Sequence, residues 1–147
     1  MIWYDSPLEL SYYIYGGIMK SKFIGAKKLI LFKAYSRSDV GYRGTRLALM
    51  QINEHEKIGL FCYGEKYDNM LTKKGFILNP REDLNNDRFV SELNRCTTHI
   101  FLRNGNFGPY YYFGTSDYAS RLDKTHLLLK LNTTEIPVDI YKKFRII

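Results

Sequence analysis

Two stretches of the chain interleave basic and aromatic residues in a pattern that could bind a polyanion. The first stretch contains Lys33, Tyr35, Arg37, Tyr42, Arg43 and Arg46. In the second stretch, Arg103 is followed by Tyr110 and Tyr112. Lysine and arginine hold phosphate groups, and tyrosine rings can stack on unpaired bases, so the pattern indicates nucleic-acid binding. The same residues could instead pack the edge of a core, which leaves a purely structural role open.

The charge of the chain also favours a polyanionic partner. The 147 residues include 22 Lys+Arg and 15 Asp+Glu, which gives a formal net charge of +7. Residues 1–50 hold 8 basic and 3 acidic side chains, and residues 101–147 hold 7 and 4, whereas the middle third is close to neutral. If the first and last thirds meet in the fold, they form one basic face. A charge excess that only keeps the protein in solution is the alternative.

Patterns for catalysis and metal binding are weak. The three histidines are His55, His99 and His126. They lack the close spacing of a zinc motif, although the last two could approach each other across neighbouring strands. The only local candidate for a metal-dependent nuclease is the group Glu65, Lys66 and Asp68, because such a site needs acids and a lysine near a strand end. The sequence therefore favours a binding module over an enzyme and predicts no metal and no cofactor.

Composition narrows the class of protein further. Cys62 and Cys96 are too few for a disulfide framework, so both are predicted to be buried thiols in a reducing compartment. There is no apolar run of about 18 residues and no signal-peptide pattern, so we expect a cytoplasmic protein without a membrane partner. The length and the 45% hydrophobic content predict a single domain over residues 1–147.

The first half of the chain predicts short helices and one hairpin. Ser6 and Ser36 each lie three residues before an acid, which is the pattern of a helix cap. The expected elements are a helix over 6–15, an element of either type over 27–35, a short helix over 37–43, and strands over 46–52 and 58–63 that form a hairpin.

The most informative stretch is residues 99–118, which predict two strands joined by a turn rich in glycine and asparagine. Aromatic residues at 110–113 favour a strand. Because successive side chains of a strand point to opposite faces, Tyr110 and Tyr112 share one face, and Tyr111 and Phe113 share the other. We expect one pair to be buried and the other to be exposed beside Arg103.

The remaining elements complete the predicted fold. They are a helix over 69–74 capped by Asp68, an apolar run at 76–78, helices over 88–94 and from about Thr134 to Phe144, and a strand over 125–131. The strands are joined mainly as hairpins rather than through helical crossovers. The sequence therefore predicts an α+β domain with a curved, mostly antiparallel sheet or small open barrel and short flanking helices.

Several stretches resemble one known family. They are Tyr35 to Val40 (YSRSDV), His99 to Arg103 (HIFLR), Tyr111 to Gly114 (YYFG), Asp117–Tyr118, Leu127 to Lys130, Ile136–Pro137 and Ile140–Tyr141. These stretches resemble the C-terminal domain of unknown function of bacterial superfamily II helicases that also carry a phospholipase-D-type nuclease domain. The likeness extends in patches over residues 29–144.

The resemblance implies an accessory domain that recognises DNA in restriction or phage-defence systems. One departure matters. The family usually carries a Phe-His-Trp-Gln-Ser-Gln-like segment, whereas the equivalent stretch here, Asn85 to Arg95, lacks it and the only tryptophan is Trp3. If that segment recognises the ligand in the family, this protein recognises a different ligand or has lost the ability to recognise one.

Three functional hypotheses follow. The first is a DNA-binding recognition module in which Arg37, Arg43, Arg46 and Arg103 contact phosphate, and Tyr35, Tyr110 and Tyr112 line a shallow pocket for a base or modified base. The second is a phage-encoded inhibitor or interaction protein that acts on a host defence enzyme. The third is a small metal-dependent nuclease.

Overall fold

The computed structural model describes residues 29–37, 39, 49–51, 54–81, 84–85 and 87–144. Its strands are β1 (Ala34–Tyr35), β2 (Leu49–Gln51), β3 (Glu56–Tyr63), β4 (Met70–Thr72), β5 (Gly75–Leu78), β6 (Thr97–Asn104), β7 (Tyr110–Arg121) and β8 (Leu127–Leu131). Its helices are the short 3-10 helix η1 (Glu65–Tyr67), α2 (Asp87–Asn94) and α3 (Val138–Phe144).

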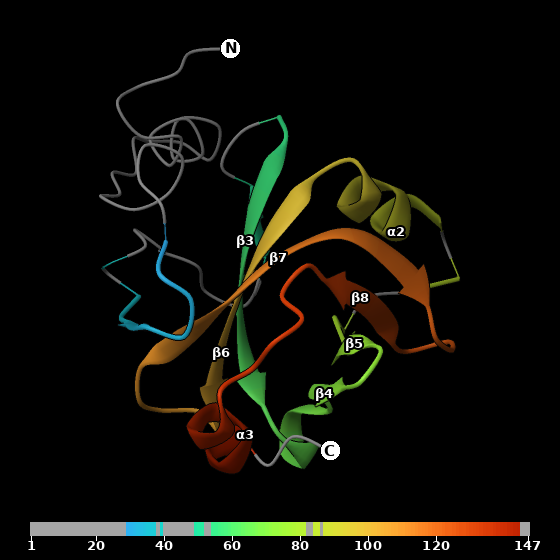
Figure 1. Ribbon diagram of the computed structural model, residues 1–147. Coiled ribbons are helices and arrows are strands. Elements are labelled where there is room, and N and C mark those ends of the chain that lie inside the picture. Colours follow the sequence, from blue (N-terminus) through green and yellow to red (C-terminus); the bar gives the residue numbers. More distant parts are fainter. Residues whose placement is uncertain are drawn as a thin grey trace.

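The eight strands form one open, strongly curved sheet (Figure 1). The strand order is β2-β3-β6-β7-β8-β5-β4, and β1 pairs with β7 outside this path. Every neighbouring pair is antiparallel except β3–β6, which is parallel. This arrangement confirms the predicted α+β class with a curved, mostly antiparallel sheet.

Strand β7 is the element that bends the sheet. Its first part pairs with β6 and its last part with β8, and the register shifts once in each pairing. Gly114 lies at the first irregularity with φ of 88°, a conformation that glycine adopts without steric cost. A Cβ atom at this position would lie 2.1 Å from Thr133 Oγ1, so only glycine lets β7 approach the segment that follows β8.

The parallel β3–β6 pairing was not foreseen from the sequence. A parallel pair needs a long crossover, and here it contains the β4–β5 hairpin and α2. The end of α2 is attached to β7 because the Asn94 amide donates to Ala119 O at 2.8 Å and accepts from Ala119 N at 2.7 Å. The two longer helices lie at opposite ends of the sheet (Figure 1).

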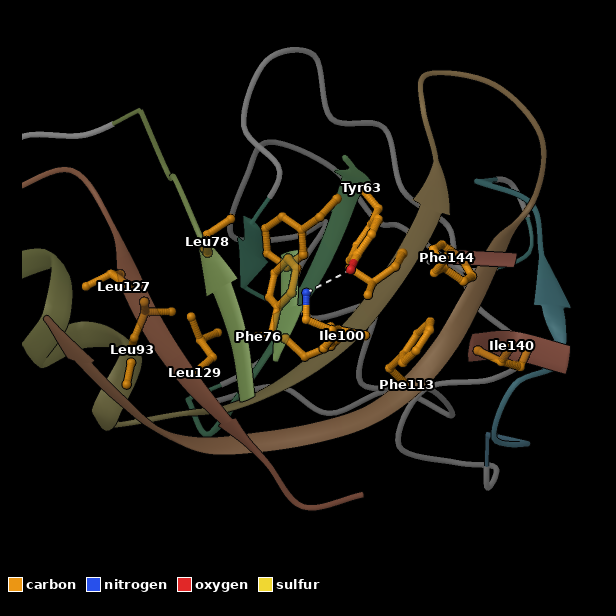
Figure 2. Close-up of a cluster of buried hydrophobic side chains, with 14 of the residues drawn as sticks. Tyr63, Phe76, Leu78, Leu93, Ile100, Phe113, Leu127, Leu129, Ile140 and Phe144 are labelled. Carbon is orange, nitrogen blue, oxygen red and sulfur yellow. Dashed lines mark hydrogen bonds between the residues drawn. The ribbon is translucent and has the colours of Figure 1, made fainter. Parts of the chain in front are cut away.

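One face of the sheet carries the larger of two apolar clusters, which we call the large core. Its buried members are Phe61, Tyr63, Leu71, Phe76, Leu78, Leu84, Leu93, Ile100, Leu102, Phe113, Ala119, Leu127, Leu129, Ile140 and Phe144. Figure 2 shows how Phe144 from α3 packs beside Phe113, and the two rings meet edge to face at 5.3 Å. The buried hydroxyl of Tyr63 accepts a hydrogen bond from Leu71 N at 3.0 Å, so this polar atom is satisfied.

The other face carries the small core. Its buried members are Tyr35, Met50, Ile58, Leu60, Phe101, Tyr110 and Tyr112. The expected division of β7 into one buried and one exposed pair is therefore wrong. Tyr110 and Tyr112 are 2% and 6% exposed in the small core, while Phe113 is fully buried in the large core and Tyr111 is half-buried against it. The physical reason is that β7 lies within the sheet, where both of its faces are covered.

Most predicted elements in the described part of the chain are confirmed. They are the hairpins β2–β3 and β6–β7, strand β8, and helices α2 and α3. The helix predicted over 69–74 is wrong, because β4 and β5 form a hairpin there. Asp68 adopts the left-handed conformation, with φ of 60°, and ends η1 instead of capping a helix.

Other expectations are met only in part. The predicted helix over 6–15 lies outside the described residues, as does nearly all of the one over 37–43. At the start of the latter, Ser36 N donates to Asp39 Oδ2 and Asp39 N donates to Ser36 Oγ, which is the predicted capping pattern. Cys96 is buried, but Cys62 is only half-buried. Among the described residues, no helix is long and apolar enough to cross a membrane.

Candidate nucleic-acid interface

Three tyrosines come from the short stretch where β1 pairs with the start of β7. In the antiparallel pairing of these strands, Tyr35 lies opposite Tyr110, and Ala34 lies opposite Tyr111. Tyr35 and Tyr110 face the small core, whereas Tyr111 packs against the large core. The start of β7 therefore presents aromatic rings to both faces of the sheet.

A cationic side chain lies over each of these rings. We call these three cations, Lys33, Arg103 and Lys143, the basic corner. The distances to the ring centres are 5.8 Å from Lys33 Nζ to Tyr35, 4.7 Å from Arg103 Cζ to Tyr110, and 5.0 Å from Lys143 Nζ to Tyr111. All three lie within the range of a cation–π interaction. None of the cations is paired with an acid within the described part of the chain. Their positive charge is therefore held in place but not neutralised there.

Arg103 is the most constrained of the three. Its Nε atom is buried and has no hydrogen-bond partner among the described residues. Burying a hydrogen-bond donor without a partner costs free energy, so unpaired buried donors are rare in folded proteins. The guanidinium lies over the ring of Tyr110, with Cζ 4.7 Å from the ring centre. The terminal nitrogens make no hydrogen bond to a described residue and can serve an external acceptor.

An aromatic side chain is exposed at the turn between β6 and β7. Phe107 is 82% exposed and lies between Gly105 and Gly108, both at positive φ. The base of the turn is anchored, because Gly105 N donates to Tyr63 O and the Asn104 amide donates to Lys143 O, both at 3.1 Å. A fixed turn with an exposed ring beside the basic corner offers a stacking surface.

A chain of polar side chains continues along the same face of the sheet as Tyr110. His99 contacts Tyr112 OH through Nδ1 at 3.0 Å and Glu56 Oε1 through Nε2 at 2.8 Å. A neutral imidazole satisfies both contacts if the phenol donates to Nδ1 and Nε2–H donates to the carboxylate. Burial raises the pKa of Tyr112, and the nearby Glu56 charge raises it further. Tyr112 therefore stays a phenol and its hydroxyl is held in place by His99.

The residues predicted to bind nucleic acid differ in how deeply they are buried. Tyr35 and Tyr110 are buried beneath cations, and Tyr112 is buried but lines a surface pocket. Arg37 is exposed and Arg103 is half-buried, whereas Arg43 and Arg46 lie outside the described residues. Their contact with nucleic acid stays a prediction.

Sequence reasoning missed Lys143 and Phe107. Lys143 lies in the helix predicted from about Thr134 to Phe144 but was not identified as a binding residue. A phenylalanine among glycines and asparagines was the available signal for Phe107, because such turns usually carry polar side chains.

The residues of the nuclease hypothesis do not form a metal centre. The Asp68 carboxylate accepts hydrogen bonds from His126 Nε2 at 2.5 Å and from the Asn79 amide at 3.1 Å. Glu65 and Lys66 are exposed on η1. Among the described residues, no group of three metal-ligating side chains could hold an ion.

Asp68 instead belongs to a polar clamp that joins two turns. His126 Nδ1 contacts Asp123 Oδ1 at 2.8 Å, so one imidazole links η1 to the β7–β8 turn. The Asp123 contact, with Asp68 adding to it, raises the pKa of His126. Backbone hydrogen bonding from Thr125 is the main reason that the pKa of Asp123 is lowered to about 2. His99 and His126 therefore serve separate networks.

The chain matches no protein-family model and no curated protein. The resemblance to the helicase C-terminal domain stays a prediction from the quoted stretches. Function is therefore proposed from the basic corner and its surroundings.

Proposed function

We propose that the protein is a DNA-binding module that holds phosphates at the basic corner. The observation that carries this proposal is that Lys33, Arg103 and Lys143 each lie over a tyrosine ring at one end of β7. Following the resemblance, we place the module in restriction or phage defence, or in a phage's response to these.

Phosphate is the ligand that suits this arrangement best. The three cations are oriented by the rings beneath them and meet no acid in the described chain, so a phosphate would find charge that is already positioned. Backbone contacts of this kind set the position of a protein on nucleic acid without reading its sequence. Arg37, Arg43 and Arg46 follow β1 directly in sequence, and we propose them as additional phosphate contacts.

The exposed ring of Phe107 extends the proposed interface. An aromatic side chain can stack on an unpaired base of any type, and such a contact is worth about 1–3 kcal/mol. Stacking at this turn would place a base next to the phosphates held by Arg103 and Lys143.

A protein-interaction module is the second candidate, and α3 carries the observation that favours it. Val138 is 68% exposed and Tyr141 is 42% exposed. Exposed apolar residues on one helix are typical of a surface that docks a protein. Substitution of both by serine would weaken binding of a partner protein but leave binding of DNA unchanged.

Paired lysine substitutions test the proposal. Fluorescence anisotropy of a labelled oligonucleotide would be measured at low salt for wild type, for Lys33→Ala/Lys143→Ala, and for Lys73→Ala/Lys74→Ala at the β4–β5 turn. Both variants lose two positive charges from exposed positions, so they share a net charge. We expect the first variant to bind at least about fivefold more weakly than the second. Equal affinities for the two variants, or no binding by wild type, would overturn the proposal.

A further inference from the structure

A surface pocket of about 560 Å³ opens next to the basic corner. It lies between the segment before β1, strand β7 and the segment after β8, and its lining includes Leu29, Leu31, Tyr112, Asn132, Thr134 and Glu135. This volume is within the range of pockets that hold small organic molecules. The sequence pattern marked Thr134 only as the start of a helix and assigned no binding role to the residues that follow β8.

One side of the pocket is apolar. Leu29 and Leu31 line it together with Tyr112, whose hydroxyl contacts His99 and whose ring packs 5.0 Å from that of Phe101. The close approach of β7 to the segment after β8 is fixed by the hydrogen bond from Thr133 Oγ1 to Phe113 O at 2.8 Å. Two leucines and a tyrosine suit a flat, largely apolar ligand.

The polar side of the pocket offers acceptors. The Asn132 amide nitrogen donates to Thr115 Oγ1 at 2.8 Å and to Asp117 Oδ2 at 2.9 Å, which leaves its carbonyl oxygen as the available group. The carboxylate of Glu135 and the hydroxyl of Thr134 are exposed and have no partner among the described residues. A ligand that fits here must present hydrogen-bond donors.

We propose that this pocket binds one unpaired nucleobase that carries an exocyclic amino group, namely adenine, cytosine or guanine but not thymine. This inference rests on the proposed function and names what the module reads. At their Watson–Crick edges adenine, cytosine and guanine present an amino donor, whereas thymine presents one N–H between two carbonyl oxygens, which the Glu135 carboxylate would repel. The base must be unpaired because this edge is otherwise buried in the base pair.

The position of the pocket matches a nucleotide that also contacts the basic corner. Tyr112, in the pocket, and Tyr110, beneath Arg103, are two residues apart on the same face of β7. Their Cα atoms are therefore separated by roughly 7 Å along the strand. The two sites together form a surface with acceptors at one end and cations at the other, which complements an amino-bearing base linked to phosphate.

Three single-stranded oligonucleotides of equal length, oligo(dA), oligo(dC) and oligo(dT), provide the test at one salt concentration. Wild type should bind oligo(dA) and oligo(dC) at least about fivefold more tightly than oligo(dT). Glu135→Gln should reduce this preference to less than about twofold, because the amide can donate to the thymine carbonyl. The matched control is Glu65→Gln on η1, which makes the same change in net charge and should strengthen binding of all three equally.

The outcomes separate this inference from the proposed function. If wild type binds all three oligonucleotides equally, or if Glu135→Gln keeps the wild-type preference, the pocket does not read a base, although the module still binds DNA. If wild type binds none of them at low salt, the proposed function fails and this inference fails with it.

Discussion

The two faces of the sheet share the same strands but carry different kinds of side chain. In the large core the Tyr63 hydroxyl has its partner in Leu71 N, and the buried Thr98 lies on the same face of β6 as Ile100 and Leu102. The small-core face holds the Glu56–His99–Tyr112 chain, the edge of a pocket, and a buried Arg103 Nε that has no hydrogen-bond partner among the described residues. Because polar groups are costly to bury, we propose that the polar groups of the small-core face serve binding.

The largest expected effect is on the large core. Phe113→Ala removes a fully buried ring that meets Phe144 at 5.3 Å and Phe32 at 5.4 Å. The free energy of unfolding should fall by about 3–5 kcal/mol, measured by urea denaturation. Phe107→Ala serves as the control and should change stability by less than about 0.5 kcal/mol. A loss below about 1 kcal/mol for Phe113→Ala would show that this face is not the main core.

A smaller loss is expected on the other face. Tyr112→Phe keeps the ring but removes the donor to His99 Nδ1, so the stability should fall by about 1–3 kcal/mol in the same assay. Tyr118→Phe, at an exposed position of β7, should be neutral. If both phenol deletions have equal effects, the polar chain does not hold Tyr112.

The turn next to the basic corner should matter for binding and not for folding. Phe107→Ala should weaken binding of single-stranded DNA by about 1–3 kcal/mol, because one stacked base is lost. Phe107→Trp should retain the affinity, since it keeps a stacking surface. Equal weakening by both substitutions would argue against stacking.

The clamp around His126 should produce the smallest effect, because its acids are exposed to solvent. The pKa of His126 is raised in the folded state, so its contribution is complete below the ordinary value of 6.5 and is lost as pH rises through the raised value. The pKa values of Asp68 and Asp123 are lowered, so their contribution is complete above 3.8 and is lost as pH falls.

Thermal unfolding between about pH 5 and pH 9 measures this effect as the difference in Tm between wild type and His126→Gln. The difference should shrink as pH rises through the raised pKa of His126. A difference that does not change with pH would mean that the imidazolium does not link the two turns.

Local signals made part of this fold predictable from sequence. The β6–β7 hairpin follows from a glycine-rich turn between β-favouring runs, and α2 and α3 follow from apolar spacing and capping residues. The parallel β3–β6 pairing left no such signal, because its strands are far apart in the chain. The helix predicted to begin after Asp68 was wrong because aspartate suits both a helix cap and the left-handed conformation that Asp68 adopts here.

The candidate site was predictable in its residue types but not in its geometry. Arg103 and the tyrosines of β7 were identified from composition and alternation. Burial of Tyr110 and Tyr112 depends on how both faces of the sheet are covered, which no local pattern encodes. Lys143 comes from α3, which only the folded chain brings next to Tyr111.

The salt dependence of DNA binding tests the basic corner most directly. For wild type, the logarithm of the association constant for a single-stranded oligonucleotide should fall linearly with the logarithm of KCl concentration, by about 0.7 per neutralised phosphate. Lys33→Ala/Lys143→Ala should make this slope shallower by about 1–2, whereas Lys73→Ala/Lys74→Ala should leave it unchanged. A slope that is the same in all three proteins would contradict the assignment of phosphate binding to the basic corner.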